Sequence, residues 1–365
     1  MHLVSLDVPY PPDYGGAMDI FYRIESLYRL GFKLTMHVFE YGRGKQEHLE
    51  KYGKVIYYGR SFSKLQLLSK TPFIVLSRKS DSLLKNLLLD TDPILFEGLH
   101  TTYFLSHPKL KERIKFVRTH NIEHEYYRQL ASGTSSLFKK LFFLLESKKL
   151  NHFEENIKYA NLILAIKPHD AEHFKKLNPN VTTLPASIPK ELVNYQLTKE
   201  YALFHGNLSV IENENAVIWI YNTIKNSISD DFEFVVAGKN PSEELVDFCK
   251  ENRLKLFTNP SIHKMNELIY DARIHVFHSK AESGVKLKLL QSINSCGHII
   301  TVKDLIFDSE IDQLCHVVNN EHEFNSIFLA LMNQMLNQNE FDKRIEFLKS
   351  YFQIEAQVLG NMLNV

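Results

Sequence analysis

The sequence predicts an α/β protein made of two Rossmann-like domains, each built on a parallel sheet. The chain has 365 residues, more than a single hydrophobic core usually serves. Short apolar strands alternate with helices in two successive series. Between the series, Pro185–Thr198 contains two prolines and little periodicity. We therefore expect domains at residues 1–186 and 187–344. Because ligands of open parallel sheets bind at the carboxyl ends of the strands, we expect the domains to face a common cleft.

The first series consists of short, apolar, β-branched or aromatic strands, as is typical of buried parallel strands. Helical patterns lie between them, and Ala17–Leu30 has an apolar face before Gly31 ends it. That face consists of Ile20, Ile24, Leu27 and Tyr28. The six predicted strands are Leu3–Leu6, Leu34–Phe39, Val55–Tyr58, Ile94–Glu97, Ile114–Thr119 and Leu162–Ile166.

The second series repeats the alternation. Its last segment, Phe341–Leu363, is a plausible amphipathic helix that ends the second domain or packs back on the first. The predicted helices are Ala216–Lys225, Glu243–Glu251 and Met265–Ala272. The predicted strands are Tyr201–His205, Phe232–Ala237, Leu254–Phe257, Ile274–Phe277 and His298–Val302.

Composition is ordinary for a soluble globular protein, with 44% hydrophobic and 24% charged residues. Cys249, Cys296 and Cys315 are scattered without a Cys-x-x-Cys pair, which argues against both a zinc site and a disulfide framework and fits a reducing cytosol. The N-terminus lacks a signal pattern, and no apolar run approaches the ~18 residues of a membrane span. We therefore expect a cytoplasmic protein, and no nucleic acid partner is expected.

Net charge is zero but unevenly distributed. Residues 1–185 carry 27 Lys+Arg against 19 Asp+Glu, and the remainder carries 16 against 24. This asymmetry suggests that the first half faces something anionic, unless it arose by chance. Within that half, Ser135–Leu150 combines apolar residues with four lysines. Such a helix can lie on an anionic membrane surface, or it is an ordinary helix with one buried face.

The segment Arg273–Thr301 predicts a strand, a polar loop, a helix that ends at Gly297, and a second strand. Lys286 and Lys288 fall in the first turn of that helix. Backbone N–H groups and cations at a helix start attract phosphate. The sequence therefore predicts half of a site for a phosphorylated ligand.

Two strand ends in the first half carry candidate site residues. Gly15 and Gly16 directly precede a helix, where they permit close approach to a ligand or form a simple tight turn. His120 and His124 follow the strand Ile114–Thr119. His120 is expected to donate a hydrogen bond in the cleft, unless it is a structural histidine. A helical pair of histidines four residues apart could bind a metal, but the HExxH order is absent and no metal is expected.

Three strand ends in the second half carry similar candidates. Gly206 and Asn207 follow one strand, and Lys239 follows the next, where it contacts a phosphate or is simply solvated. The loop Asn259, Pro260 and Ser261 is suited to backbone recognition of a flat ring.

The ordered set of these motifs resembles the retaining, GT-B-fold glycosyltransferases of family four, and more narrowly those of bacterial surface-polysaccharide clusters. The motifs are YPPDYGG, THNIEHEYY, FHGNLSVIENENA, FVVAGKNP and SGVKLKLLQSINSCG, which span nearly the whole chain. The resemblance implies a nucleotide diphosphate-sugar donor held mainly by the second domain and an acceptor held mainly by the first. It also implies a C-terminal helix, at about residues 345–365, that crosses back to the first domain. No metal or cofactor is implied. The resemblance further implies that, during the transfer, the leaving diphosphate deprotonates the acceptor hydroxyl.

Residue by residue, the resemblance places Gly15 and Gly16 near the diphosphate and acceptor, and His120 near the transferred sugar. It places Asn259–Ser261 at the base. A further group faces the sugar and the diphosphate and consists of Ser283, Gly284, Val285, Lys286 and Lys288. The same donor region is expected to include Gly206, Asn207 and Lys239.

The chain departs from the family pattern of two glutamates separated by seven residues. Ser283 and Gln291 occupy those positions, with Glu282 one residue early. Glutamine accepts hydrogen bonds more weakly than a carboxylate. The usual Arg-Lys-Gly is also replaced by Asn207-Leu-Ser209, and Lys286, Lys288 and Lys239 are expected to supply the missing cations.

The sequence therefore predicts a retaining, metal-independent hexosyltransferase that acts on a lipid-linked, polyprenyl-linked or polysaccharide acceptor at the inner membrane face. Two alternatives stay open at this point. One is a GT-B epimerase or phosphorylase, and the other is a non-catalytic binding subunit that kept the fold.

Overall fold

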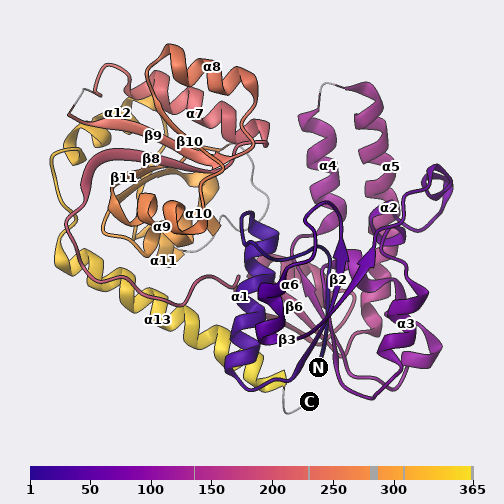
Figure 1. The fold of residues 1–365 in the computed structure, drawn as a ribbon. Helices are drawn as coiled ribbons and strands as arrows, with labels where there is room; N and C mark the ends of the chain where they lie inside the picture. The colour runs from indigo at the N-terminus through magenta and orange to yellow at the C-terminus, as the bar shows by residue number, and fades with distance from the viewer. Residues whose placement is uncertain (135, 229–230, 280–286, 307–308, 363–365) are drawn as a thin grey trace. The chain divides into compact units, whose positions relative to one another are not determined.

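A computed structural model describes residues 1–134, 136–228, 231–279, 287–306 and 309–362 of the chain. Glu282, Ser283, Gly284, Val285 and Lys286 lie outside these described residues. The chain groups into two compact units. The first contains Met1–Pro12, Gly16–Ser187 and Ile354–Val365, and the second contains Asp13–Gly15 and Ile188–Gln353. Figure 1 shows a sheet flanked by helices in each unit.

The first unit is built on a seven-stranded parallel sheet in the order β3-β2-β1-β4-β5-β6-β7. Its strands are β1 (His2–Ser5), β2 (Leu34–Glu40), β3 (Gly53–Gly59), β4 (Ile94–Glu97), β5 (Lys115–Thr119), β6 (Leu162–Ala165) and β7 (Val181–Thr183). Its α-helices are α1 (Gly15–Arg29), α2 (Phe73–Leu76), α3 (Asp81–Leu87), α4 (Glu123–Gly133), α5 (Leu137–Phe153) and α6 (Pro168–Lys175). Its 3₁₀ helices are η1 (Glu47–Tyr52), η2 (Lys64–Leu68), η3 (Leu99–Phe104), η4 (Pro108–Leu110) and η5 (Glu154–Tyr159).

The two faces of this sheet bury separate cores because successive residues of a strand point to opposite faces. Leu3 packs in one core with α1 and the end of the C-terminal helix, whereas Val4 packs in the other with α3, η3 and α6. Leu95 and Phe96 divide between the two cores in the same way. Apolar residues on both faces explain why these strands are almost continuously apolar in sequence.

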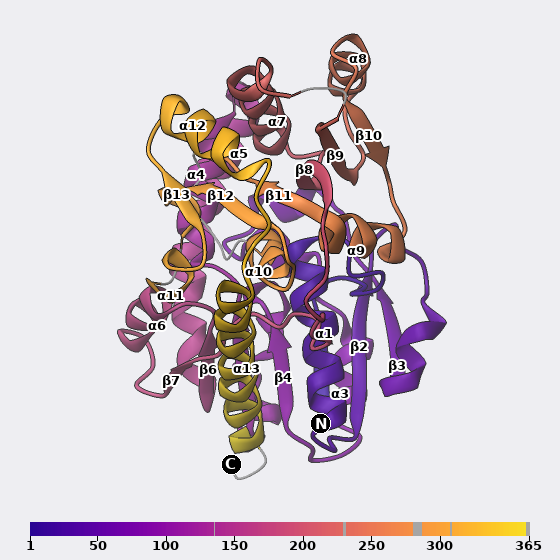
Figure 2. The same cartoon turned by 90° about the vertical axis from the view of Figure 1, so that its left-hand side faces the viewer.

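The second unit is built on a six-stranded parallel sheet in the order β10-β9-β8-β11-β12-β13. Helices α7, α8 and α12 cover one face of the sheet, and α9 and α10 cover the other (Figures 1 and 2). The strands are β8 (Lys199–Asn207), β9 (Glu233–Lys239), β10 (Lys255–Thr258), β11 (Ala272–Val276), β12 (His298–Val302) and β13 (His316–Val318). The helices are α7 (Ile211–Ile224), α8 (Glu243–Glu251), α9 (Ile262–Asp271), α10 (Leu287–Ile293), η6 (Lys303–Leu305), α11 (Ser309–Asp312), α12 (Glu321–Leu331) and α13 (Gln338–Asn361).

The long helix α13 belongs to both units, because its residues from Ile354 onward group with the first unit. Near its start, Arg344 is buried and donates to the carbonyl of Gly297 at 2.6 Å within the second unit. Near its end, Leu359 and Met362 join the core of the first unit. The predicted return of the C-terminal helix to the first domain is confirmed.

The predicted fold class of two parallel-sheet α/β domains is confirmed, and three local predictions are corrected. Tyr28 was expected on the apolar face of α1 but is 51% exposed, and buried Asp19 and Arg23 extend the inner face instead. The helix expected to end at Gly297 already ends at Ile293. The short strands β7 and β13 escaped prediction because three residues carry too little pattern.

Candidate functional site

The carboxyl edge of the first sheet holds His120 between two buried carboxylates. His120 follows β5, and its Nε2 donates to Glu97 Oε2 at 3.1 Å. Its Nδ1 lies 3.5 Å from Asp19 Oδ2, which belongs to α1. Glu97 ends β4, so neighbouring parallel strands bring it beside His120. The imidazole side chain is only 11% exposed, and its hydrogen bond to Glu97 fixes its orientation while Nδ1 faces Asp19.

Two buried arginines balance the charge of these carboxylates. Arg23 Nε donates to Glu97 Oε1 at 2.8 Å, and the Arg23 guanidinium also pairs with Asp19 one helical turn away. Arg118 Nη2 lies 3.3 Å from Asp19 Oδ2. A buried ionic group is tolerable only when it is paired, and each of these four residues is ion-paired, although Arg23 Nη1 and Arg118 Nε have no hydrogen-bond partner among the described residues.

The network keeps both acids ionised. Burial by itself raises the pKa of Asp19, but Arg118, Arg23 and His120 reverse this effect and hold the pKa of Asp19 well below its ordinary value. Burial also raises the pKa of Glu97, but Arg23 and His120 outweigh burial, so the pKa of Glu97 is lowered. The two carboxylates therefore stay charged at every physiological pH and continue to hold the imidazole.

The segment that leaves the first unit is tied to the same network. The Ser187 N–H donates to Asp19 Oδ1 at 2.7 Å, and the Ser187 hydroxyl donates to Glu355 Oε1 on α13 at 2.5 Å. Asp19 thus links α1, the chain after β7 and, through Ser187, the last turns of α13 inside the first unit.

His100 and Glu123 lie beside this network at the same sheet edge. His100 Nδ1 is 3.9 Å from Glu123 Oε1. Burial, with Arg78 next in effect, lowers the pKa of His100 well below its ordinary value. Burial, together with the charge of Glu154, raises the pKa of Glu123 to about 8. The pair therefore presents a neutral imidazole and a largely protonated carboxyl at neutral pH, which suits hydrogen bonds to uncharged hydroxyl groups.

At the carboxyl edge of the second sheet, Lys288 is held beside the end of β8. Its Nζ donates to Asn213 Oδ1 at 3.1 Å, and Asn213 Nδ2 donates to the Asn207 carbonyl at 2.8 Å. The ammonium lies 4.7 Å from the centre of the Phe204 ring, a cation–π contact. Gly206 has a φ of +158°, and a Cβ there would sit 3.5 Å from Asn213 Nδ2. The predicted residues Gly206, Asn207 and Lys288 are therefore brought together.

The neighbouring strand ends, of β9 and β10, are joined by Asn259. Its N–H donates to the Gly238 carbonyl at 2.8 Å, and its side-chain oxygen accepts from the Asn240 N–H at 3.0 Å. Ser261 is the N-cap of α9, where its hydroxyl oxygen accepts from the Lys264 N–H at 3.1 Å. Asn259 thus binds the backbone on either side of Lys239, whose ammonium pairs with the Asp13 carboxylate. The Asn259 and Ser261 side chains shape the loop that includes Pro260.

Gln291 lies one turn after Lys288 in α10, in a separate environment. It lines a small pocket of the second unit. The other lining residues are Ile188, Pro189, Asn266, Ile269, Tyr270, Leu290 and Asn294. In the first unit, Gly15 and Gly16 occupy the first two positions of α1.

Helix α5 exposes a series of large apolar side chains instead of burying them. Leu137 is 83% exposed and Phe138 is 81% exposed, and Leu141, Leu144 and Leu145 are exposed to a smaller degree. Helices α4 and α5 run side by side and project from the first unit (Figure 1). In the described residues, no helix has the length and apolar character needed to cross a membrane. We call Leu137–Leu145 the α5 apolar surface.

Three residues of the His120 network, Asp19, Arg23 and Ser187, were absent from the candidates. A charged pair at i and i+4 on the otherwise apolar face of α1 was the available signal for Asp19 and Arg23. Ser187 and Glu355 carry no local signal, because they meet only in the folded chain, 168 residues apart.

No model of a known protein family matches the chain. A protein of Klebsiella pneumoniae, described as an uncharacterized 44.6 kDa protein in the cps region, is 27% identical over 317 residues, which cover 82% of this chain and 81% of that protein. Two solved structures share the fold. The pneumococcal O-GlcNAc transferase GtfA, in complex with UDP and GlcNAc, has a TM-score of 0.68 at 10% identity, covering 100% of this chain and 99% of that chain. WaaG, a glycosyltransferase involved in lipopolysaccharide biosynthesis, has a TM-score of 0.68 at 11% identity, covering 98% of both chains.

These similarities extend over both units and both parallel sheets. The chain therefore has the GT-B fold, the two-domain architecture of these glycosyltransferases.

Proposed function

We propose that this protein is a glycosyltransferase that moves a sugar from a nucleotide diphosphate-sugar to a hydroxyl group of a glycan or lipid-linked acceptor. The observation that carries this proposal is the position of His120 at the carboxyl edge of a parallel sheet in a GT-B fold. There its imidazole is held beside Glu97 and Asp19. The K. pneumoniae relative from the cps region and the fold of WaaG support an acceptor in cell-surface polysaccharide synthesis.

The two domains divide the substrates in this proposal. The first, residues 1–186 with the end of α13, holds the acceptor, and the second, residues 187–344, holds the donor. UDP bound to GtfA supports a uridine nucleotide. Lys288 and Lys239 contact the diphosphate, and the loop containing Asn259 holds the base. Lys288 already sits beside the Gly206 turn, where a phosphate can approach the backbone closely.

The transfer proceeds with retention and without a metal at the reacting atoms. The acceptor oxygen forms its bond to the anomeric carbon on the face from which the diphosphate departs, and the diphosphate takes the hydroxyl proton. His120 contacts the transferred sugar, and Lys288 stabilises the charge of the leaving diphosphate. Catalysis then rests on positioning and on preorganised charge, without a covalent nucleophile.

Product analysis with a panel of nucleotide-sugars tests this function. Incubation with membrane lipid extract as the acceptor source should give a glycosylated lipid and free UDP with one of the donors. His120→Ala should lower this turnover by about 100-fold or more, as the loss of a preorganised polar contact does. His152→Ala, on the exposed face of α5, is the matched control and should be unaffected. If the His120→Ala variant turns over as fast as the wild type, His120 does not contribute to the transfer.

One observation favours a second candidate, a binding subunit without catalysis. Gln291 stands where the family pattern has a glutamate, and it lines its own pocket beside Tyr270. Calorimetric titration with UDP and other nucleoside diphosphates separates the two. Binding of one of them supports the transferase, whereas no detectable binding to any of them supports the subunit.

A further inference from the structure

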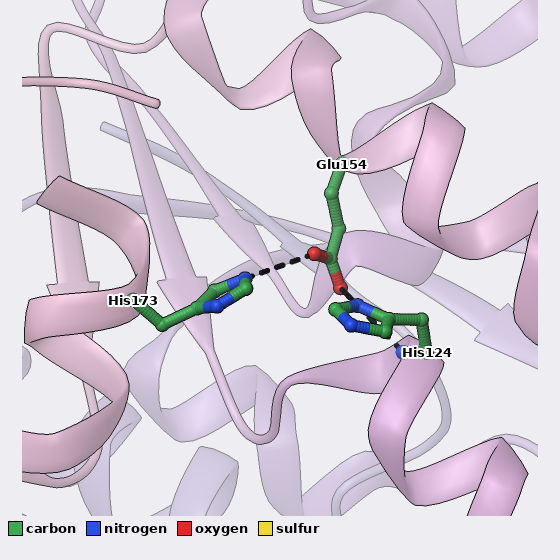
Figure 3. Close-up of side chains that lie close together, drawn as sticks. All are labelled: His124, Glu154 and His173. Carbon is green, nitrogen blue, oxygen red and sulfur yellow. Dashed lines mark hydrogen bonds and ion pairs between the residues drawn. The ribbon is translucent and has the colours of Figure 1, made fainter. Parts of the chain in front are cut away.

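Three side chains converge in the first unit outside the His120 network: His124, Glu154 and His173. They come from α4, η5 and α6, which are far apart in sequence. His124 Nδ1 lies 2.8 Å from Glu154 Oε1, and His173 Nε2 lies 3.1 Å from Glu154 Oε2. Figure 3 shows the two imidazoles on either side of the carboxylate. The fold therefore brings two nitrogens and one carboxylate together.

Within the described part of the chain, no arginine or lysine forms an ion pair with Glu154. The Glu154 side chain is 2% exposed, and its ion pairs among the described residues are with His124 and His173 alone. A buried carboxylate needs a positive partner. Either an imidazolium or a bound cation supplies it.

The ligand types and spacing suit a tetrahedral transition metal. The ligand atoms of the three residues all lie within 4.8 Å of one another. Zinc–nitrogen and zinc–oxygen bonds of about 2.0–2.1 Å place tetrahedral ligand atoms about 3.4 Å apart, so ion binding would draw the side chains together by up to about 1.4 Å through changes in side-chain torsion. The 23% exposed side chain of His173 leaves one side of the cluster open for entry and for a fourth, water ligand.

A second cluster, formed by Asp19, Glu97 and His120, also has its possible ligand atoms within 4.8 Å of one another. Its charge, however, does not call for a bound cation. Arg23 and Arg118 already neutralise its two carboxylates. A cation there would be repelled by two guanidinium groups. Of these two clusters, the His124 cluster is therefore the better cation site.

We propose that His124, Glu154 and His173 bind one Zn²⁺-like ion that fastens α4, η5 and α6 together. Each imidazole offers the nitrogen that now faces Glu154 and carries its proton on the other ring nitrogen. The ion stabilises the first domain and touches none of the residues proposed to hold the donor, so the transfer itself remains independent of metal.

Cobalt titration of the untagged full-length protein, stripped with a chelator and dialysed, tests the site. Co²⁺ should bind at one equivalent with the visible absorption of a tetrahedral complex, and Zn²⁺ should displace it. Zn²⁺ should also raise the midpoint of thermal unfolding, because a ligand of the native state stabilises that state. Failure of the wild type to take up one equivalent overturns the proposal.

Two variants and one control locate the ion. His173→Ala removes a ligand from a partly exposed position, and Glu154→Gln keeps the side-chain shape while removing the charge. Each should weaken Co²⁺ binding by about 100-fold or more, since changes to groups beyond the ligands already cost 10–100-fold. His152→Ala, whose side chain is 81% exposed, should bind as the wild type does. Unchanged affinity in both His173→Ala and Glu154→Gln, each with native circular dichroism, places any bound ion elsewhere and overturns the proposal.

Discussion

The imidazole of His120 depends on residues that never reach solvent. Asp19 is 1% exposed and Arg23 and Glu97 are fully buried, yet these three residues and Arg118 determine where the imidazole points. A histidine on a flexible loop would sample several orientations, whereas this one is held by its hydrogen bond to Glu97 while Nδ1 faces Asp19. Rigid support of this kind is what preorganised catalysis requires.

Asp19→Asn should destabilise the first domain strongly. The substitution leaves Arg23 and Arg118 buried with one carboxylate between them, and breaking a buried ion pair typically costs about 3–5 kcal/mol. Urea denaturation followed by circular dichroism measures the loss. Asp81→Asn, at the exposed start of α3, is the control and should cost about 1 kcal/mol or less. A loss for Asp19→Asn no larger than that of the control contradicts the structural role of the network.

Because His205 is buried as a neutral imidazole, the free energy of unfolding should fall in mild acid. Burial, with Lys288 next in effect, lowers the pKa of His205 to about 3, so it stays neutral in the folded state. The unfolded chain takes up a proton near pH 6.5, so stability is full above that pH and falls by up to about 1.4 kcal/mol per unit as pH drops toward 3.

The pH effect is measured by comparing unfolding midpoints at pH 7 and pH 5. His205→Gln should show a smaller drop than the wild type, because glutamine does not titrate. His263→Gln, at an exposed position of α9, should show the same drop as the wild type. An equal drop in all three proteins would mean that His205 carries no part of the effect.

At the scale of single elements, the exposure of helix α5 bears on two interpretations of one sequence pattern. Its sequence fits either a surface helix with a buried face or a membrane-binding helix. In the structure, the α5 apolar surface points outward, and Leu68 of the neighbouring η2 is 85% exposed as well. Lys149 connects the two segments, since its Nζ donates to the Leu67 carbonyl at 2.8 Å. These observations favour a peripheral association with an anionic membrane face.

Replacement of Phe138 and Leu141 by glutamate should abolish sedimentation with anionic vesicles. The wild type should bind vesicles that contain phosphatidylglycerol, bind neutral vesicles more weakly, and release from the anionic vesicles as salt rises, because lysine attraction is screened. Leu329→Glu, at a 46% exposed position of α12, is the control and should bind normally. Equal sedimentation of wild type with anionic and neutral vesicles at all salt concentrations would remove the membrane hypothesis.

At the scale of the whole molecule, the proposed donor should stabilise the native chain. A saturating UDP-sugar at 100 times its Kd adds about 2.7 kcal/mol to the unfolding free energy. For a chain of this size, that corresponds to a shift of a few degrees in the thermal midpoint.

Lys288→Ala should reduce this ligand-induced shift, because it removes the ammonium proposed to contact the diphosphate. A thermal-shift screen of nucleotide-sugars measures it. Lys225→Ala, at the exposed end of α7, should leave the shift unchanged. If the same donor raises the thermal midpoint of Lys288→Ala and of the wild type by equal amounts, Lys288 has no role at the diphosphate.

Local patterns predicted most of the strands and helices well. The boundaries of β4, α8 and β12 match the prediction residue for residue, because a buried strand or an amphipathic helix with clear caps is defined by its own sequence. The candidate sites were predicted less completely. His120 became a candidate because it follows a strand, and Lys288 because it falls in the first turn of a predicted helix, but Asp19 and Asn213, which contact them, were not candidates.

The sequence by itself determined the α/β alternation, the position of the break between the two series, and the strand ends at which His120, Gly206 and Lys239 stand. These features depend on residues close together in the chain. Only the tertiary structure decided that Asp19, Glu97 and Ser187 form one buried network, that α5 exposes its apolar residues, and that His124, Glu154 and His173 converge. Parallel strands and their crossover helices bring together side chains 19 to 168 residues apart, and no local pattern encodes such contacts.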